Sequence, residues 1–108
     1  MKKINILKEK KDFDRLFKKR NQLSSKYVYI YKDENTVDNY RFGICVSKKI
    51  GNAVTRNKIK RQIKDIIDKS CLHFSNNDYI ILVKQSIKDA KFVEIKDDII
   101  NLLKKINE

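Results

Sequence analysis

Hydrophobic residues recur every three or four positions in three stretches of the chain, which is the spacing of amphipathic helices. In the first stretch, residues 12–20, Phe13, Leu16 and Phe17 fall on one face, and Asp12 is suited to cap the amino end. Basic residues occupy the opposite face. The pattern therefore predicts a short helix near the start of the chain.

The longest predicted helix covers residues 53–72 and has Asn52 as its N-cap. Arg56 falls beside the apolar stripe in the first turn, so we expect it to project past the end of the sheet. A last helix is predicted over residues 91–107, and the lysines at its carboxyl end suit the helix dipole. The inward positions expected in these two helices are Ile59, Ile63, Ile66, Ile67, Ser70 and Phe74, then Phe92, Ile95, Ile99, Leu102, Leu103 and Ile106.

Alternating or continuous apolar residues predict three strands. In residues 26–32 three tyrosines alternate with Val28 and Ile30, so the two sets face opposite sides. Residues 40–47 alternate in the same way and are expected to pair antiparallel with residues 26–32. Residues 78–84 form a near-continuous apolar run, which is typical of a strand covered on both faces. The predicted order is α-β-β-α-β-α, an α+β fold in which helices and a small sheet form a two-layer sandwich.

The length of 108 residues fits a single domain covering residues 1–108. Its 26 basic and 14 acidic residues give a net charge of +12, which predicts salt-sensitive binding to a phosphate-rich partner. Nucleic acid is the first candidate and an anionic membrane surface the second. The chain lacks the apolar core of a secretory signal and a run of the roughly 20 apolar residues that span a bilayer, so a cytoplasmic location is expected. Cys45 and Cys71 form no CxxC pair and are interpreted as buried thiols.

The positive charge is concentrated between residues 48 and 64, where seven basic residues occur without one acid. The candidate binding residues of this segment are Lys48, Lys49, Arg56, Asn57, Lys58, Lys60, Arg61 and Lys64. They lie on a strand end, a Gly51-Asn52 turn and a helix start, where free backbone N–H groups and the helix dipole favour phosphate. A solvated basic helix face is the alternative, but the absence of compensating acids favours a polyanion. The spacing does not distinguish DNA from RNA.

Aromatic residues form a second candidate site. Phe13 and Phe17 share a helix face with basic neighbours, and single-stranded bases stack on such surfaces, although core packing is the stronger alternative. Catalysis by side chains finds little support. His73 has no recognisable partner, and the pair Asp97-Asp98 is more typical of a solvated helix face than of a metal site. No catalytic or metal-binding residue is therefore predicted.

The stretch from Arg41 to Arg61, RFGICVSKKIGNAVTRNKIKR, closely resembles the signature of the bacterial ribonuclease P protein component. The first helix, the DYIILVK strand and the terminal helix fit the same family, so the resemblance covers essentially the whole chain. The Arg-Asn-Arg triplet of the family is Arg56-Asn57-Lys58 here, which keeps the charge but loses a bidentate donor.

The resemblance implies a fold like the second domain of ribosomal protein S5, with a left-handed crossover between parallel strands, although the general rule favours the right hand. It also implies that the chain is the protein subunit of ribonuclease P, an endonuclease that removes the 5′ leader of precursor tRNA. The partners would be the catalytic RNA, bound by the residue 48–64 segment, and the leader, bound by Phe13, Phe17, Lys18 and Ile30. Hydrolysis would belong to the RNA with its Mg²⁺, and neither DNA nor a membrane would be a partner.

Two other classes remain open from the residues alone. A ribosomal or RNA-chaperone protein would share the composition and the basic helix but would have no role in tRNA cleavage. A DNA-binding regulator would use the basic helix as a recognition helix, but no helix-turn-helix pair is evident.

Overall fold

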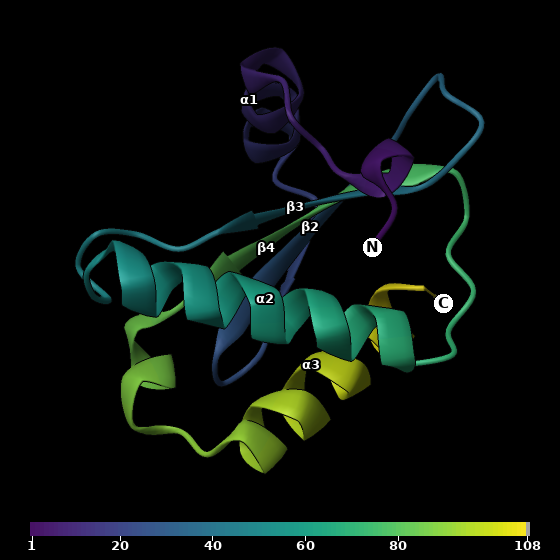
Figure 1. Cartoon of the computed structure of the whole chain (residues 1–108). Coiled ribbons are helices and arrows are strands. Elements are labelled where there is room, and N and C mark those ends of the chain that lie inside the picture. The colour runs from purple at the N-terminus through teal and green to yellow at the C-terminus, as the bar shows by residue number, and fades with distance from the viewer. Residues whose placement is uncertain (108) are drawn as a thin grey trace.

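The computed structural model describes residues 1–107. The major elements follow one another in the predicted order, with one additional short strand (Figure 1). The helices are α1 (Lys10–Lys19), α2 (Ala53–Lys69) and α3 (Phe92–Ile106), and the strands are β1 (Gln22–Ser24), β2 (Val28–Glu34), β3 (Arg41–Cys45) and β4 (Asn77–Val83). Short 3-10 helices cover Lys3–Asn5 and Gln85–Asp89. No helix within the described residues is long and apolar enough to cross a membrane.

The four strands form one sheet in the order β1-β2-β4-β3. Strand β4 pairs antiparallel with β2 and parallel with β3. The expected direct pairing of residues 26–32 with residues 40–47 is therefore wrong, because β4 lies between them. The apolar sequence of β4 correctly predicted a strand covered on both faces. The connection from β3 through α2 to β4 is the crossover implied by the family resemblance, while its left hand stays a prediction.

Helices α2 and α3 cover one face of the sheet, and α1 lies on the other (Figure 1). The larger core lies between the sheet and α2 and α3, and includes Val28, Ile30, Ile63, Ile81 and Ile99. A smaller cluster under α1 consists of Leu7, Leu16 and Ile80, with Phe13, Phe17, Tyr31 and Cys45 packed against it. The predicted two-layer sandwich is thus present, and α1 adds a partial third layer.

The helix ends agree with the expectations only in part. Asn52 caps α2 as predicted, since its Oδ1 accepts from the Thr55 N–H at 2.9 Å. Helix α2 ends at Lys69 rather than at residue 72, and Cys71 adopts a left-handed backbone with φ of 59°. Helix α1 begins at Lys10 instead of being capped by Asp12.

Three residues outside the basic segment also depart from the expectations. Phe92 is 42% exposed rather than inward, because it begins α3 beyond the edge of the core. Cys71 is exposed, which contradicts the predicted burial of both thiols. Asp98 is not simply solvated, since its carboxylate accepts from the Ser25 hydroxyl at 2.6 Å and from the Tyr27 N–H at 3.0 Å. Asp98 thereby fastens the start of β2 to α3.

Candidate RNA-binding surfaces

The basic residues of the 48–64 segment lie on the turn after β3 and on the first three turns of α2. We call the set Lys48, Lys49, Arg56, Lys58, Lys60, Arg61 and Lys64 the basic patch. Within residues 1–107, none of its members forms an ion pair, and Asp65 of the same helix is engaged by Lys69 at 3.3 Å. The charges of the basic patch are therefore uncompensated within the described part of the chain. Asn57 is exposed on the same stretch of α2.

The turn that presents the first two lysines covers residues 48–50 rather than Gly51-Asn52. The Ile50 N–H donates to the Ser47 carbonyl at 3.1 Å, and Ile50 is buried as an apolar anchor. Gly51 has an ordinary negative φ, but a Cβ there would lie 2.9 Å from Cγ2 of Thr55. Gly51 thus allows the turn to pass close to the first turn of α2, whose free N–H groups lie among the lysines.

Arg56 is half-buried, in accord with its predicted place beside the apolar stripe. Its Nε is covered by protein atoms and has no hydrogen-bond partner within residues 1–107. The aliphatic stem of such a side chain packs on the protein while the charged end reaches solvent. Arg56 is therefore held more firmly than the exposed Arg61 and Lys58.

The aromatic residues of α1 are neither fully buried nor fully exposed. Leu16 is the residue of α1 that enters the small core, at 1% exposed, while Phe13 and Phe17 are half-buried on either side of it. The ring of Phe17 meets that of Tyr31 edge to face, with centroids 4.9 Å apart and planes at 81°. Lys18 is exposed on the same helix. The structure thus brings together Phe13 and Phe17, two of the four residues expected to bind the leader, and adds Tyr31 to them.

The assignment of Ile30 to this surface is wrong. Ile30 is completely buried in the larger core, on the face of the sheet that α2 and α3 cover. Tyr31, the next residue of β2, lies on this surface instead, because successive residues of a strand face opposite sides. The alternation of tyrosines in residues 26–32 was the signal for Tyr31, but the sequence did not tell which side α1 would cover.

Beyond α1, one row of residues runs across the sheet without a helix above it. The ladder places Ser24, Tyr29, Leu82 and Cys45 side by side on the face that α1 occupies. Tyr29, Leu82 and Cys45 are half-buried, so they form an open floor next to the aromatic residues of α1. We call this floor, together with Phe13, Phe17 and Tyr31, the aromatic groove.

The charge of Lys60, a member of the basic patch, acts on Cys45 of the aromatic groove. Burial raises the pKa of the Cys45 thiol, and the positive charge of Lys60 partly offsets that effect. Lys60 is therefore the member of the basic patch whose charge acts on the aromatic groove. A single-stranded nucleic acid lying in the groove would therefore meet positive charge at the β3 edge.

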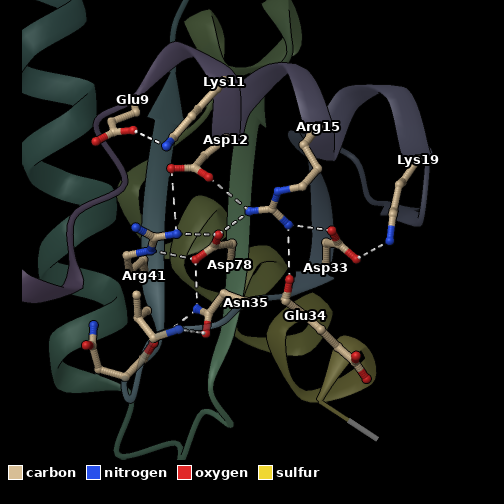
Figure 2. Close-up of polar contacts among 12 residues, drawn as sticks. Glu9, Lys11, Asp12, Arg15, Lys19, Asp33, Glu34, Asn35, Arg41 and Asp78 are labelled. Atoms are coloured by element: carbon tan, nitrogen blue, oxygen red, sulfur yellow. Dashed lines mark hydrogen bonds and ion pairs between the residues drawn. The ribbon is translucent and has the colours of Figure 1, made fainter.

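A buried carboxylate holds α1 in position at the other end of the sheet. Asp78 of β4 is completely buried and accepts hydrogen bonds from three separate segments (Figure 2). Arg41 of β3 donates from Nε and from Nη2, each at 2.8 Å, and Asn35 donates from Nδ2 at 2.9 Å. Arg15 of α1 donates to the same carboxylate. Such charge-assisted bonds compensate the cost of burying the charge.

Arg15 also fastens α1 to β2 (Figure 2). Its guanidinium donates to the Asp33 carboxylate, to the Glu34 carbonyl at 3.0 Å and to Asp12 at 3.3 Å. Lys19, one turn further along α1, lies 3.2 Å from Asp33. The orientation of α1, and with it the position of its aromatic residues, is fixed by these contacts.

The network keeps Asp78 and Asp33 ionised. Burial by itself would raise the pKa of Asp78, but hydrogen bonds from Arg41, Asn35 and Arg15 outweigh it and hold that pKa below its usual value. The pKa of Asp33 is lowered in the same way, since hydrogen bonds from Arg15 and Lys19 outweigh its burial. The ionised state is therefore the one that holds α1 on the sheet.

The carboxylates that converge here do not suit a Mg²⁺ ion. Asp12, Asp33 and Asp78 are each engaged by arginine, so their oxygens are not free to bind a hydrated cation. Among residues 1–107, no group of three or more His, Cys, Asp or Glu side chains is arranged to hold a metal ion.

Comparison with known proteins identifies the family. The family model described as Ribonuclease P matches residues 1–107. A ribonuclease P protein component of Staphylococcus aureus is 36% identical over 105 residues, which cover 96% of this chain and 91% of the relative. The solved structure of a Staphylococcus aureus RNase P protein gives a TM-score of 0.87 at 35% identity and 94% coverage of both chains. The solved structure of the Thermotoga maritima RNase P protein gives a TM-score of 0.84 at 27% identity, covering 95% of this chain and 98% of the other. The chain therefore belongs to the family of protein components of bacterial ribonuclease P, an endoribonuclease.

Proposed function

We propose that this chain binds the catalytic RNA of ribonuclease P through the basic patch and the 5′ leader of precursor tRNA through the aromatic groove. The observation that carries the proposal is the presence of two chemically different surfaces on one small chain. One is a set of seven cations without ion pairs in the described chain, and the other is a half-exposed row of aromatic and apolar side chains. The first suits a folded phosphate backbone, and the second suits unstacked bases.

The basic patch fits structured RNA because its charges are held on a rigid helix and turn. Arginine binds phosphate through two parallel N–H donors, and the backbone N–H groups at the start of α2 add uncharged donors. Arg56 and Arg61 lie five positions apart on α2, so they serve different phosphates. The contacts position the RNA without reading its sequence.

The aromatic groove fits a single strand because it offers ring surfaces beside positive charge. Phe13, Phe17 and Tyr31 provide rings on which bases stack in a sequence-tolerant way. Mature tRNA has no leader and would lose these contacts. The groove would therefore increase affinity for the precursor over the product and favour product release.

The chemistry of phosphodiester hydrolysis is assigned to the RNA subunit and to Mg²⁺ bound mainly by that RNA. The role of this chain is to hold the substrate in register with the catalytic RNA, and the assembly would act in the cytoplasm. Neither DNA nor a membrane is a partner in this proposal.

Single-turnover cleavage of a precursor tRNA, with the chain alone, with a bacterial ribonuclease P RNA alone and with both, tests the proposal. The chain alone is expected to cleave nothing, and addition of the chain to the RNA is expected to restore 5′ maturation at low Mg²⁺. Equal affinity of the assembled enzyme for precursor and mature tRNA would contradict leader binding. Association with ribosomal subunits and no effect on cleavage would instead favour a ribosomal role.

A further inference from the structure

A hollow lies between α2 and α3, on the side of the sheet opposite the aromatic groove. Its volume is about 120 Å³, and it is lined by Asp65, Ile66 and Lys69 of α2 and by Phe92 and Lys96 of α3. The buried Ile66 and the ring of Phe92 supply its apolar surface. The three charged residues are exposed, so the hollow opens to solvent with polar groups around it.

The Phe92 ring is exposed to an extent that is unusual for so large an apolar side chain. It is 42% exposed, whereas Ile95, one turn further along α3, is 5% exposed. The aromatic pairs formed within residues 1–107 do not include Phe92. The ring therefore offers a surface to a planar group. The hollow beside it suits one such group, since its volume is well below the roughly 300–1,000 Å³ of a pocket for a drug-sized ligand.

Positive charge adjoins the apolar surface of the hollow. Phe92 and Lys96 are four positions apart on α3, so their side chains share one face of the helix. Lys96 forms no ion pair within the described chain. Lys69 lies 3.3 Å from Asp65, and this pair neutralises the acid that lines the hollow. Lys96 is therefore the lining cation that is available to a phosphate.

One face of α2 connects the hollow to the basic patch. Lys58, Arg61, Asp65 and Lys69 follow one another at three- and four-residue spacing, which aligns their side chains along the helix. Lys58 and Arg61 belong to the basic patch, and Asp65 lies about 6 Å further along the axis than Arg61. An RNA bound to the basic patch at Arg61 would therefore lie next to the hollow.

We propose that the hollow binds one unpaired nucleotide of the catalytic RNA, with its base against the Phe92 ring and its phosphate on Lys96. The inference rests on the proposed function, because it extends the contact between the basic patch and that RNA. RNA is favoured over an apolar protein partner, since the hollow has the size of one ring and adjoins exposed cations along α2. The stacked base would add an anchor that phosphate contacts do not supply.

Binding of a bacterial ribonuclease P RNA to the full chain tests the site. Phe92→Leu removes the ring but keeps an apolar side chain, while Phe92→Tyr keeps the ring. Val93→Ala is the matched control, because Val93 is 66% exposed on the same turn of α3 and does not line the hollow. Lys96→Gln and Lys104→Gln form a second pair, since Lys104 is an exposed lysine of α3 outside the hollow.

The expected result is a loss of RNA affinity without a loss of stability. Phe92→Leu should weaken binding about five-fold or more, as for one lost base stack, whereas Phe92→Tyr and Val93→Ala should not. Lys96→Gln should reduce the slope of log affinity against log salt by up to about one unit, and Lys104→Gln should leave it unchanged. The urea midpoint should be the same for all variants, because the altered side chains are exposed.

Chemical probing of the RNA 2′-hydroxyls locates the nucleotide without relying on affinity. One unpaired position should be reactive in the free RNA, protected by the wild-type chain and reactive again with Phe92→Leu. Protection that depends on the basic patch should persist in this variant and be lost with Arg61→Ala. The two variants therefore separate the hollow from the basic patch.

Three results would overturn the nucleotide site and leave the proposed function intact. The first is that Phe92→Leu changes neither affinity nor any 2′-hydroxyl reactivity while Arg61→Ala weakens binding. The second is a loss of affinity that follows a lower urea midpoint, which would make Phe92 a core residue. The third is self-association of the wild-type chain that Phe92→Leu abolishes, which would place a second copy in the hollow. If Arg61→Ala and Phe92→Leu both bind the RNA like wild type, the inference and the proposed role of the basic patch both fail.

Discussion

The ring of Phe13 lies directly against the backbone of Gly43, so closely that a Cβ at position 43 would be 2.5 Å from the ring carbon Cζ. Strand β3 therefore has a gap in its side chains at the point where α1 crosses it. The absent side chain lets Phe13 settle onto the sheet while staying half-exposed. Gly43 thus determines how closely the ring of Phe13, which forms part of the aromatic groove, approaches the sheet.

Replacing Gly43 by Ala should displace the Phe13 ring. Because that ring is partly exposed and can move outward, the unfolding free energy should fall by only about 1–3 kcal/mol, the usual cost of overpacking. Leader-dependent affinity should fall as well, since the ring leaves its place in the groove. Urea unfolding and precursor tRNA binding measure the two effects. In the double variant Gly43→Ala with Phe13→Leu, stability should recover and leader affinity should not, and recovery of both would contradict the relationship.

Phe17 and its neighbour Leu16 form a matched pair on α1. Phe17→Ala should reduce affinity for precursor tRNA by about 1–3 kcal/mol through a lost stacking contact, with little change for mature tRNA. Leu16→Ala should instead cost about 2–5 kcal/mol of folding stability, because Leu16 is buried in the small core. Melting temperature and binding of both tRNAs are to be measured on each variant. If Phe17→Ala unfolds the chain as readily as Leu16→Ala does, Phe17 is a core residue and not part of a groove.

The arginines of the basic patch should act through salt-dependent binding. Arg56→Ala and Arg61→Ala should each weaken binding to the catalytic RNA and reduce the slope of log affinity against log salt by roughly one unit per lost phosphate contact. The loss should be larger for Arg56, whose half-buried side chain is held in place. Lys104→Ala removes the same charge from the exposed surface of α3 and should leave the slope unchanged. An unaltered slope in both arginine variants would mean that the basic patch does not contact the RNA.

The Asp78 network should make the fold sensitive to acid. Because the pKa of Asp78 is lower in the folded chain than in the unfolded chain, its ionisation stabilises the fold above about pH 4. That contribution should disappear as the pH falls through the lowered folded-state pKa. Asp78→Asn should cost about 3 kcal/mol at pH 7, since it leaves two arginines without their shared partner, and should flatten the pH dependence below pH 4.

The control for this prediction is Asp14→Asn, which removes an exposed carboxylate of α1. It should shift the urea midpoint little at pH 7 and should keep the steep decline in acid. Equal urea midpoints for wild type and Asp78→Asn across the pH range would show that Asp78 contributes nothing to the stability of α1 on the sheet.

Local patterns in the sequence were sufficient for the types of the main elements and for the basic patch. The helix cap at Asn52 is a contact between near neighbours in the chain, and the spacing of the isoleucines in α2 fixes its buried side. The seven cations of residues 48–64 must lie close together because they are close in the sequence. The sequence did not predict β1, because its three residues are exposed and show no apolar alternation.

Tertiary structure decided what depends on residues far apart in the chain. The alternation in residues 26–32 defines two faces, but only the positions of α1, α2 and α3 determine that Ile30 is buried and Tyr31 lines the groove. The insertion of β4 between β2 and β3 is equally non-local, since pairing partners follow from the packing of whole elements. Arg15 and Asp78 are 63 positions apart, and no local pattern relates them. Periodicity specifies which side of an element is apolar, whereas the neighbour that covers that side is chosen by the free energy of packing the entire chain.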